Sequence, residues 1–169
     1  MVAMDNLRAM IREIPDFPLP GVLFRDITPL MRVPEAFKYV IDQLADRFKD
    51  DTLDAIVAVE SRGFLFGAPL AYKMGKLLVP VRKEGKLPAE SFRTEYSLEY
   101  GSSVVEIHKD GIQAGHGVLI VDDLLATGGT LAAAARLVEE AGARVESIAL
   151  VIELAALSGR KRLAGYEVF

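Results

Sequence analysis

Residues 118–130 read VLIVDDLLATGGT: an apolar run, two acids, a short loop and the start of a helix-forming stretch. Gly128 and Gly129 allow a tight backbone bend and a close approach to a ligand. Backbone N–H groups at the start of a helix lack an intrahelical partner and carry partial positive charge, so they form a cradle for phosphate. Thr127 and Thr130 add hydroxyl donors. We expect residues 126–130, named here the phosphate loop, to bind a phosphate group.

Two acids, Asp122 and Asp123, precede the phosphate loop. Like charges repel, so these carboxylates do not bind the phosphate, whereas as acceptors they suit the neighbouring hydroxyls of a sugar. A phosphate site beside a diol site describes a ribose 5-phosphate. Two other phosphate motifs are excluded. No Lys follows Gly129, as a P-loop requires, and Ile120 replaces the third glycine of a dinucleotide-binding fingerprint.

The flanking sequence predicts alternating strands and helices. Apolar runs such as AIVAV suit strands that are covered on both faces, and stretches with a 3.6-residue period suit helices. Strands alternating with helices indicate a mostly parallel sheet with helices on both faces, whose ligand lies at the carboxyl ends of the strands. The expected helices are 5–14, 34–49, 65–74 and 130–141, and the expected strands are 55–59, 77–81, 93–99, 103–108, 117–121 and 145–152.

Composition bounds the class of protein. The 169 residues predict a single domain, and 51% hydrophobic with 26% charged residues is a globular composition. A net charge of −4 argues against non-specific binding to nucleic acid. The absence of cysteine excludes a disulfide framework, a Cys-ligated zinc and a Cys nucleophile. We find no signal-peptide pattern and no apolar run long enough to span a membrane, so we expect a cytoplasmic protein that binds no membrane.

The 118–130 segment closely resembles the phosphoribosyl pyrophosphate (PRPP) binding motif of the type I phosphoribosyltransferases. Four further blocks occur in that family's order and narrow the resemblance to its adenine-specific branch: FPLPGVLFRDITPL (17–30), ESRGFLFG (60–67), RKEGKLP (82–88) and YSLEYG (96–101). The resemblance implies the type I phosphoribosyltransferase fold, an α/β fold with a central, mostly parallel sheet flanked by helices. Residues 1–33 would form a small N-terminal helix and base-binding hood, and residues 34–169 a PRPP-binding core with a flexible catalytic hairpin loop.

The resemblance also implies a reaction. The 5-phosphoribosyl group of PRPP would pass to N9 of adenine, giving AMP and pyrophosphate in purine salvage. Mg²⁺ would be carried by PRPP with no direct protein ligand, and the chain would form a homodimer. Two alternatives remain: a phosphoribosyltransferase for another base such as hypoxanthine or xanthine, and a non-catalytic regulator that senses PRPP or purines. Ala126 favours adenine, because hypoxanthine–guanine relatives have an Asp there; a regulator would usually need an extra DNA-binding segment.

Family roles carry over residue by residue, again as implications of the resemblance. Asp122 and Asp123 would hold the ribose hydroxyls. The 5-phosphate would be wrapped by Ala126, Thr127, Gly128, Gly129 and Thr130. The pyrophosphate would contact Ser61, Arg62, Arg82, Lys83 and Lys86, and the family often has a non-proline cis peptide at the bond that matches Glu60–Ser61. Of the two lysines, we favour Lys83 over Lys86.

Two further groups of residues follow from the same resemblance. Arg62 would be catalytic, as would Glu99 and Tyr100 of the YSLEYG loop, which closes over the substrates. Glu99 is also the candidate proton partner for N7 of the base. Adenine would be bound through backbone groups of Leu23 and Arg25, with Phe24 packing on one face of the ring and Leu154 covering the other.

Overall fold

In the computed structural model, which describes residues 4–97 and 101–169, the run AIVAV forms strand β3 (Ala55–Val59), and all five of its residues are buried. Strand β3 pairs in parallel with β4 (Leu77–Lys83) on one side and β7 (Gly117–Leu125) on the other. Strand β8 (Arg144–Glu153) continues the parallel sheet beyond β7. Continuous aliphatic burial is the pattern of a parallel sheet covered on both faces. The predicted mostly parallel sheet is therefore confirmed.

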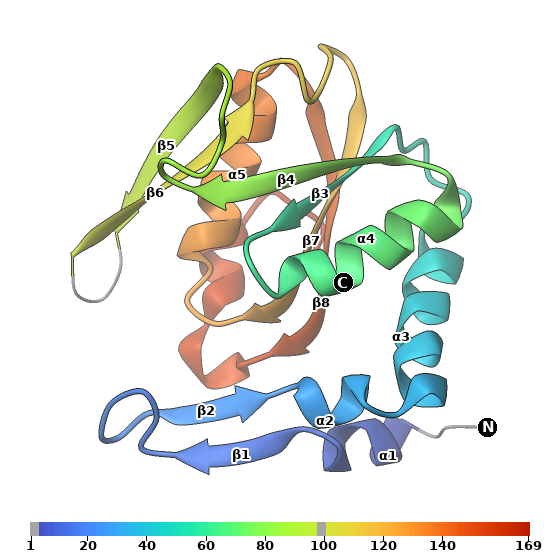
Figure 1. Ribbon diagram of the computed structural model, residues 1–169, viewed down its shortest axis with the longest axis vertical. Coiled ribbons are helices and arrows are strands. Elements are labelled where there is room, and N and C mark those ends of the chain that lie inside the picture. The colour runs from blue at the N-terminus through green and yellow to red at the C-terminus, as the bar shows by residue number, and fades with distance from the viewer. Residues whose placement is uncertain (1–3, 98–100) are drawn as a thin grey trace. The chain divides into compact units, whose positions relative to one another are not determined.

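The polar segment between β4 and β7 adds an antiparallel hairpin to one edge of this sheet. Strands β5 (Ser91–Ser97) and β6 (Ser102–His108) pair with each other, and β6 also pairs with the end of β4. The strand order is β5-β6-β4-β3-β7-β8 (Figure 1). The sequence predicted both strands of the hairpin, displaced by one or two residues.

Helices α4 (Gly63–Met74) and α5 (Gly129–Glu140) make the crossover connections β3–α4–β4 and β7–α5–β8. These connections run along the sheet in opposite directions, because β4 and β8 lie on opposite sides of the β3–β7 pair. Right-handed crossovers therefore place the two helices on opposite faces (Figure 1). The direction in which the connections run along the sheet therefore reverses between the parallel strands β3 and β7. In open α/β sheets, ligands bind at the carboxyl ends of the strands at such a point.

The structure divides the chain into two compact units, Met1–Arg47 and Phe48–Phe169. Residue 33 was the predicted end of the N-terminal segment, and helix α3 (Pro34–Arg47) lies in the first of these two units. The N-terminal unit also contains α1 (Met4–Ala9), β1 (Arg12–Pro15), β2 (Leu23–Asp26) and α2 (Thr28–Met31). The C-terminal unit ends in two short 3₁₀ helices, η1 (Ala155–Leu157) and η2 (Gly159–Leu163).

Two expectations about local structure were wrong. The helix expected over 5–14 ends at Ala9, because residues 12–15 pair with residues 23–26 in an antiparallel ribbon. The strand expected over 117–121 continues to Leu125, so Asp122 and Asp123 lie inside the strand and not after it. Both differences come from pairing with another strand, which a local period does not reveal. Among the described residues, no helix has the length and apolar character needed to cross a bilayer.

Candidate active site

The carboxyl ends of the neighbouring strands β3 and β7 bring together the ESRG loop and the two acids, which are about 60 residues apart in sequence. The Nε atom of Arg62 lies 2.8 Å from Oδ2 of Asp123, in an ion pair without hydrogen-bond geometry. Asp123 is only 4% exposed. Its backbone N–H donates a hydrogen bond of 2.8 Å to Oδ1 of Asp122. The three side chains therefore form one connected cluster at the carboxyl ends of the central strands.

Gly63, the first residue of α4, is the reason that these segments can meet. A Cβ atom on Gly63 would lie 2.8 Å from the carbonyl oxygen of Val121 and 3.0 Å from Oδ1 of Asp122. Such approaches are too close for a side chain, so α4 can begin against the end of β7 only with glycine here. The sequence analysis did not single out Gly63. Its place directly after Arg62 in the ESRG block was the available signal.

Burial and mutual repulsion change the acidity of the two carboxyl groups. Burial raises the pKa of Asp122 well above its ordinary value, and the neighbouring charge of Asp123 raises it further. Burial also raises the pKa of Asp123, although the Arg62 guanidinium acts in the opposite direction. Ionising both groups is therefore unfavourable in the free protein. Hydroxyl donors or a cation would stabilise the ionised pair, which is what a binding site for a diol or a metal-bearing substrate requires.

The phosphate loop has the geometry that its sequence predicts. Helix α5 begins at Gly129, one residue before the expected start, and Gly128 at the N-cap has φ 81°. Among the described residues, no side chain caps the helix, so none competes from the cap position for its first N–H groups. Gly128 also lies against the chain after β8, since a Cβ atom there would be 2.6 Å from the carbonyl oxygen of Gly159. A left-handed backbone and a close neighbour both require glycine at this position.

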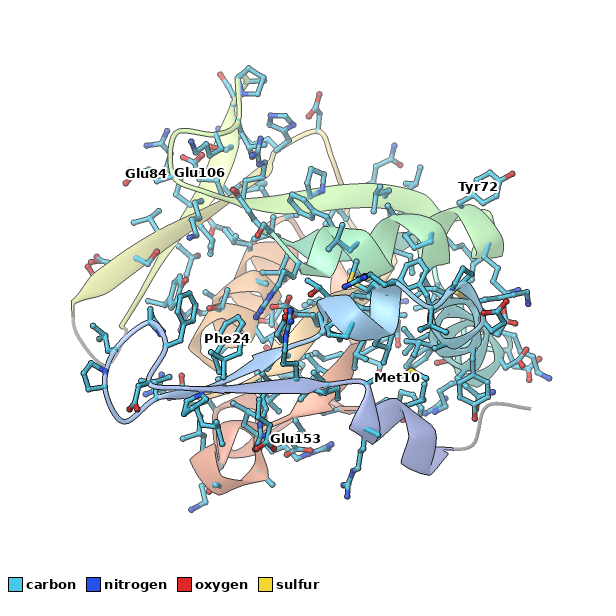
Figure 2. The ribbon with its side chains drawn as sticks, turned by 60° about the horizontal axis from the view of Figure 1, so that its bottom comes forward. Met10, Phe24, Tyr72, Glu84, Glu106 and Glu153 are labelled. Atoms are coloured by element: carbon cyan, nitrogen blue, oxygen red, sulfur yellow. The ribbon has the colours of Figure 1, made fainter. Side chains whose placement is uncertain are left out.

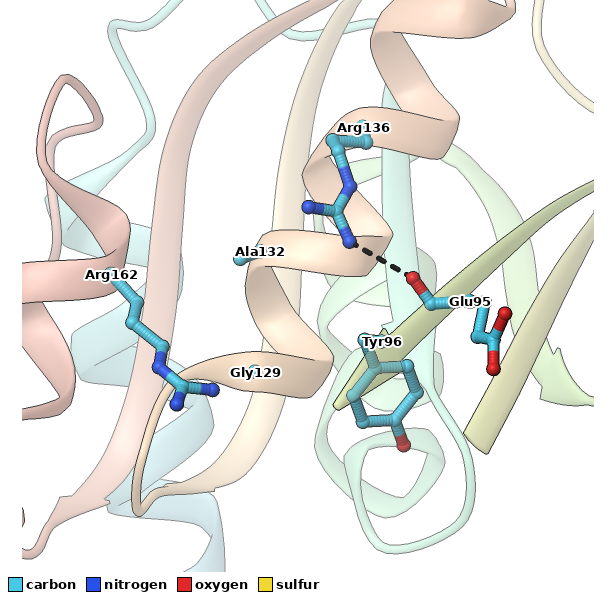
Figure 3. Close-up of a pocket in the computed structure, with 6 residues that line it drawn as sticks. All are labelled: Glu95, Tyr96, Gly129, Ala132, Arg136 and Arg162. Carbon is cyan, nitrogen blue, oxygen red and sulfur yellow. Dashed lines mark hydrogen bonds between the residues drawn. The ribbon is translucent and has the colours of Figure 1, made fainter. Parts of the chain in front are cut away.

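A pocket of about 370 Å³ opens beside the first turns of α5 (Figure 3). Figure 3 shows Arg162 extending from η2 toward Gly129, and Arg136 donating a hydrogen bond of 3.3 Å to the carbonyl oxygen of Glu95. The lining residues are Glu95, Tyr96, Gly129, Ala132, Arg136 and Arg162. The sequence analysis named neither arginine. The basic run GRKRL (159–163) was the available signal for Arg162.

The cations expected to hold pyrophosphate fall into two kinds. Arg82 is engaged: its Nε lies 3.2 Å from Oε2 of Glu60, and its guanidinium donates a 3.2 Å hydrogen bond to the carbonyl oxygen of Lys86. Glu60 also accepts a 2.9 Å bond from the backbone N–H of Lys83. Burial raises the pKa of Glu60, but the Lys83 amide and Arg82 outweigh it and leave that pKa below its ordinary value. The peptide bond Glu60–Ser61 is cis, at the position that the family resemblance indicated.

Lys83 and Lys86 remain exposed after these contacts. Neither ammonium group has an ion-pair partner among the described residues. Arg82 and Glu60 thus fix the backbone that carries Lys83, while both lysine side chains stay available to an anion.

The residues expected to contact adenine through the N-terminal unit lie together on β2. The ring of Phe24 meets that of Phe17 edge-on, with centroids 5.1 Å apart at 75°. Arg25 forms an ion pair with Glu13, its cross-strand neighbour on β1. Leu23 is 43% exposed, so the ribbon presents apolar surface.

The remaining predicted residues differ in what the structure says of them. Leu154, in the C-terminal unit, is half-buried directly after β8, and its N–H donates a 2.9 Å hydrogen bond to the carbonyl oxygen of Leu125. Glu99 and Tyr100 lie outside the described residues. Within residues 4–97 and 101–169, no three His, Asp or Glu side chains group closely enough to ligate a metal ion.

Comparison with known proteins gives this fold and site a class. Residues 28–169 match the family model of the phosphoribosyl transferase domain. Adenine phosphoribosyltransferase from Roseiflexus castenholzii is 58% identical over 164 residues, covering 97% of this chain and 95% of the relative. The chain belongs to the adenine phosphoribosyltransferase family.

Solved structures agree with this assignment. The crystal structure of adenine phosphoribosyltransferase from Thermoanaerobacter pseudethanolicus matches with a TM-score of 0.96 at 54% identity, covering 99% of this chain and 97% of the other. The Saccharomyces cerevisiae enzyme, in complex with D-2,5-dideoxy-2,5-imino-altritol 1,6-bisphosphate and adenine, matches with a TM-score of 0.92 at 45% identity. The match covers 98% of this chain and 96% of the yeast chain.

Proposed function

We propose that this chain transfers the 5-phosphoribosyl group of PRPP to N9 of adenine, giving AMP and pyrophosphate in purine salvage. The observation that carries the proposal is the placement of the half-buried Asp122 and the buried Asp123 a few residues before the start of α5, which no described side chain caps. Acceptors for a diol and donors for a phosphate are then separated by the short span of one ribose 5-phosphate. The yeast relative, whose structure contains adenine and a bisphosphate imino sugar, supports the same pair of ligands.

PRPP binding divides among three groups of residues in this proposal. N–H groups and hydroxyls of the phosphate loop (Ala126, Thr127, Gly128, Gly129 and Thr130) hold the 5-phosphate, and Asp122 and Asp123 accept hydrogen bonds from the ribose hydroxyls. Arg62 contacts the pyrophosphate, beside Ser61. Lys83 and Lys86 supply further positive charge, while Arg82 acts by positioning Lys83 through Glu60.

The chemistry follows from the charge that develops in the reaction. N9 of adenine bonds to C1 of the ribose as the C1–oxygen bond to pyrophosphate breaks, so negative charge grows on the leaving group. Fixed cations beside that group stabilise the transition state more than the ground state. We propose that Glu99 and Tyr100 cover the site during this step, which keeps water from the electron-poor ribose carbon. Glu99 would accept the proton that the base loses from N7 as N9 bonds to C1.

The donor set fits Mg²⁺ that arrives with the substrate. Mg²⁺ prefers carboxylate, phosphate and water oxygens and rarely has a cage built wholly by protein. Oxygens of PRPP and of water would supply its shell, with no direct ligand from the protein. Bound in this way, Mg²⁺ would neutralise part of the pyrophosphate charge.

Base contacts are proposed for Leu23, Phe24 and Arg25 of β2 and for Leu154. Stacking of a base on an aromatic ring is worth about 1–3 kcal/mol, which makes Phe24 the chief apolar contact.

We also propose a homodimer in the cytoplasm. Leu65 and Tyr72, seven residues apart on one side of α4, are 44% and 92% exposed, and Tyr72 projects away from the helix (Figure 2). A second copy covering this side would bury both, and sedimentation velocity would measure the oligomeric state.

A product assay tests the proposed reaction. Purified protein, Mg²⁺ and PRPP are mixed separately with adenine, hypoxanthine, guanine, xanthine and orotate, and nucleotides are measured by chromatography. We expect AMP from adenine and no nucleotide from the other bases. A product from another base would overturn the base assignment and keep the PRPP site. Binding of PRPP without any product would favour a regulator.

The raised pKa values of Asp122 and Asp123 predict how PRPP binding depends on pH. The ligand needs the ionised carboxylates, whereas the free protein holds protons on them above their ordinary pKa. Binding therefore releases protons, and the Kd for PRPP falls as the pH rises through the raised values. Calorimetric titrations in buffers of different ionisation enthalpy measure this release.

Protons released by PRPP itself must be distinguished from those released by the protein. The variant Asp122→Asn does this, because it removes one of the two carboxyl groups and leaves the ligand unchanged. We expect the variant to release fewer protons and to show a shallower dependence of Kd on pH. Equal proton release by variant and wild type would contradict a role for the pair in binding.

Lys83→Ala should raise the KM for PRPP and lower kcat, with a combined loss of about 10- to 100-fold, the worth of one charge-assisted hydrogen bond. Lys86→Ala should have a smaller effect, because Arg82 and Glu60 fix the backbone at Lys83. Steady-state kinetics with PRPP varied would measure both. Lys109→Ala, which removes an exposed lysine paired with Glu90, is the control and should leave both constants unchanged. Equal losses at all three lysines would mean that only net charge matters.

A further inference from the structure

Residues 158–163, named here the 158–163 turn, lie against the phosphate loop although they follow β8, the next strand. A Cβ atom on Gly159 would lie closer than 3.0 Å to the carbonyl oxygen of Ala126 and 2.7 Å from Cδ1 of Leu125. The contact is reciprocal, since a Cβ atom on Gly128 would lie 2.6 Å from the carbonyl oxygen of Gly159. The two glycines thus bring two backbones together with no side chain between them.

The backbone of the turn is held from several sides, so the loop and not the turn must give way to an added atom. Leu163 is 1% exposed and anchors the end of η2 in the core. Arg160 donates from Nε to the Glu153 carboxylate at 2.9 Å, and from its guanidinium to the carbonyl oxygen of Val168 at 2.8 Å. These contacts join the turn to β8 and to the C-terminal residues.

We propose that the 158–163 turn is a positioning element for the phosphate loop, and that Gly159 is the residue through which it sets the loop's shape. The N–H groups that bind phosphate belong to the residues that the turn touches. An added methyl group would push Ala126 away from the turn and rotate those N–H groups off their target. Displacements of about 1 Å at a binding site change rates and affinities by about 10- to 100-fold.

The turn also brings charge to the same place. Arg162 extends from it toward Gly129 and forms no ion pair with any residue in the described ranges (Figure 3). The 158–163 turn therefore fixes the shape of the phosphate loop by close contact and also places a cation beside the start of α5. The inference rests on the proposed function, because it takes the 126–130 segment to be the phosphate site.

The test compares Gly159→Ala with Gly117→Ala. Gly117 begins β7, at the opposite end from the phosphate loop, and a Cβ atom there would also lie closer than 3.0 Å to a backbone oxygen, that of Thr52. Neither glycine has a left-handed φ, so each change adds a steric conflict without backbone strain. We expect both variants to lose stability in urea. Only Gly159→Ala should weaken binding of ribose 5-phosphate, by about 10-fold or more, and raise the KM for PRPP.

The KM for adenine should stay within about twofold of wild type in both variants, because the turn acts on the phosphate end of the site. Equal changes in the Kd for ribose 5-phosphate would overturn the inference and reduce the turn to a stabilising contact. Failure of the proposed function is seen separately, as absence of AMP formation by the wild-type protein.

If Gly159→Ala does not fold, a second pair of variants, which adds no atoms, provides the test. Arg160→Ala removes the ties to Glu153 and Val168 without adding atoms. Arg144→Ala removes an equivalent pair of contacts, to Glu146 and the carbonyl oxygen of Gly115, at the far end of the sheet. We expect about a two- to fivefold weaker Kd for ribose 5-phosphate with Arg160→Ala only. No difference between the arginine variants would contradict the positioning role.

Discussion

Changing Asp122 and Asp123 together to Asn should lower kcat/KM for PRPP by about 100- to 10,000-fold. Two charge-assisted hydrogen bonds to the ribose hydroxyls would be lost, each worth about 1.5–3 kcal/mol. The amide has the same shape as the carboxyl group, so the pocket keeps its size. Steady-state assays of AMP formation, with PRPP varied at saturating adenine, would measure the loss.

The single change Asp122→Asn should increase the stability of the fold, whereas it lowers activity. The effects of Asp122 on catalysis and on folding can therefore be measured separately. Burial and the charge of Asp123 raise the pKa of Asp122 in the folded protein above its ordinary value of 3.8. A group whose pKa is raised by folding favours the folded state below pH 3.8 and opposes it as pH rises through the folded value. Replacement by neutral Asn should therefore raise the free energy of unfolding at pH 7, and this gain should shrink toward pH 4. Urea denaturation at the two pH values measures it.

Asp54→Asn is the matched control for these changes. Oδ2 of Asp54 accepts a 2.8 Å hydrogen bond from the N–H of Gly117, at the opposite end of β7 from the site. The variant should lose about 1 kcal/mol of stability and keep its activity. Turnover of the Asp122/Asp123 double variant within about threefold of wild type would remove the acids from the mechanism.

Arg62→Ala should lower kcat by about 100- to 1,000-fold and also destabilise the fold. Removing one fixed cation beside a developing charge has effects of this size. Asp123, 4% exposed, would lose its charged neighbour, and its pKa would rise further. Since the Arg62 side chain is 35% exposed, water compensates in part, and we expect a loss of about 1–2 kcal/mol at pH 7. Kinetics and urea denaturation measure the two effects.

Two further variants separate the roles of Arg62. Arg62→Lys keeps the charge without the planar fork of donors, so it should restore stability more than kcat. Adding Asp123→Asn to Arg62→Ala should cost less stability than the sum of the single changes, because the buried charge is then absent. Additive losses would mean that the ion pair contributes nothing to folding.

The sequence predicted the elements whose signals are local. The run AIVAV, the stop signals Gly75 and Gly142, and the period of residues 130–141 were sufficient to predict most strands and helices of the C-terminal unit, although not the 3₁₀ helices η1 and η2. The antiparallel ribbon of residues 12–15 and 23–26 was missed because its first strand continues a helix-like period and its pairing with the second strand is not visible in that period. The end of β7 was misplaced for the same reason, since pairing with β8 carries the strand through both acids.

For the candidate site too, residues with local signals were predicted and contacts between separate segments were not. The acids and the phosphate loop were identified from spacing and residue type, and the family resemblance supplied Arg62. Spacing does not show which of two nearby cations is paired, so Arg82 was grouped with Lys83 although Arg82 holds Glu60. Spacing does not show contacts through space either. Gly63 closely approaches Asp122, which is 59 positions away, and Gly159 closely approaches Ala126, which is 33 positions away.

The central place of β3 has a consequence for synthesis of the chain. Its neighbour β4 follows soon after it, but its other neighbour, β7, ends only at Leu125. At translation speeds of about 5–20 residues per second, one edge of an entirely apolar strand waits roughly 3 to 13 seconds for its partner. During that interval the nascent polypeptide presents an unsatisfied hydrogen-bonding edge, the kind of surface that invites association with other chains. The arrangement that creates the ligand crevice therefore also creates the period in which a chaperone would be most useful.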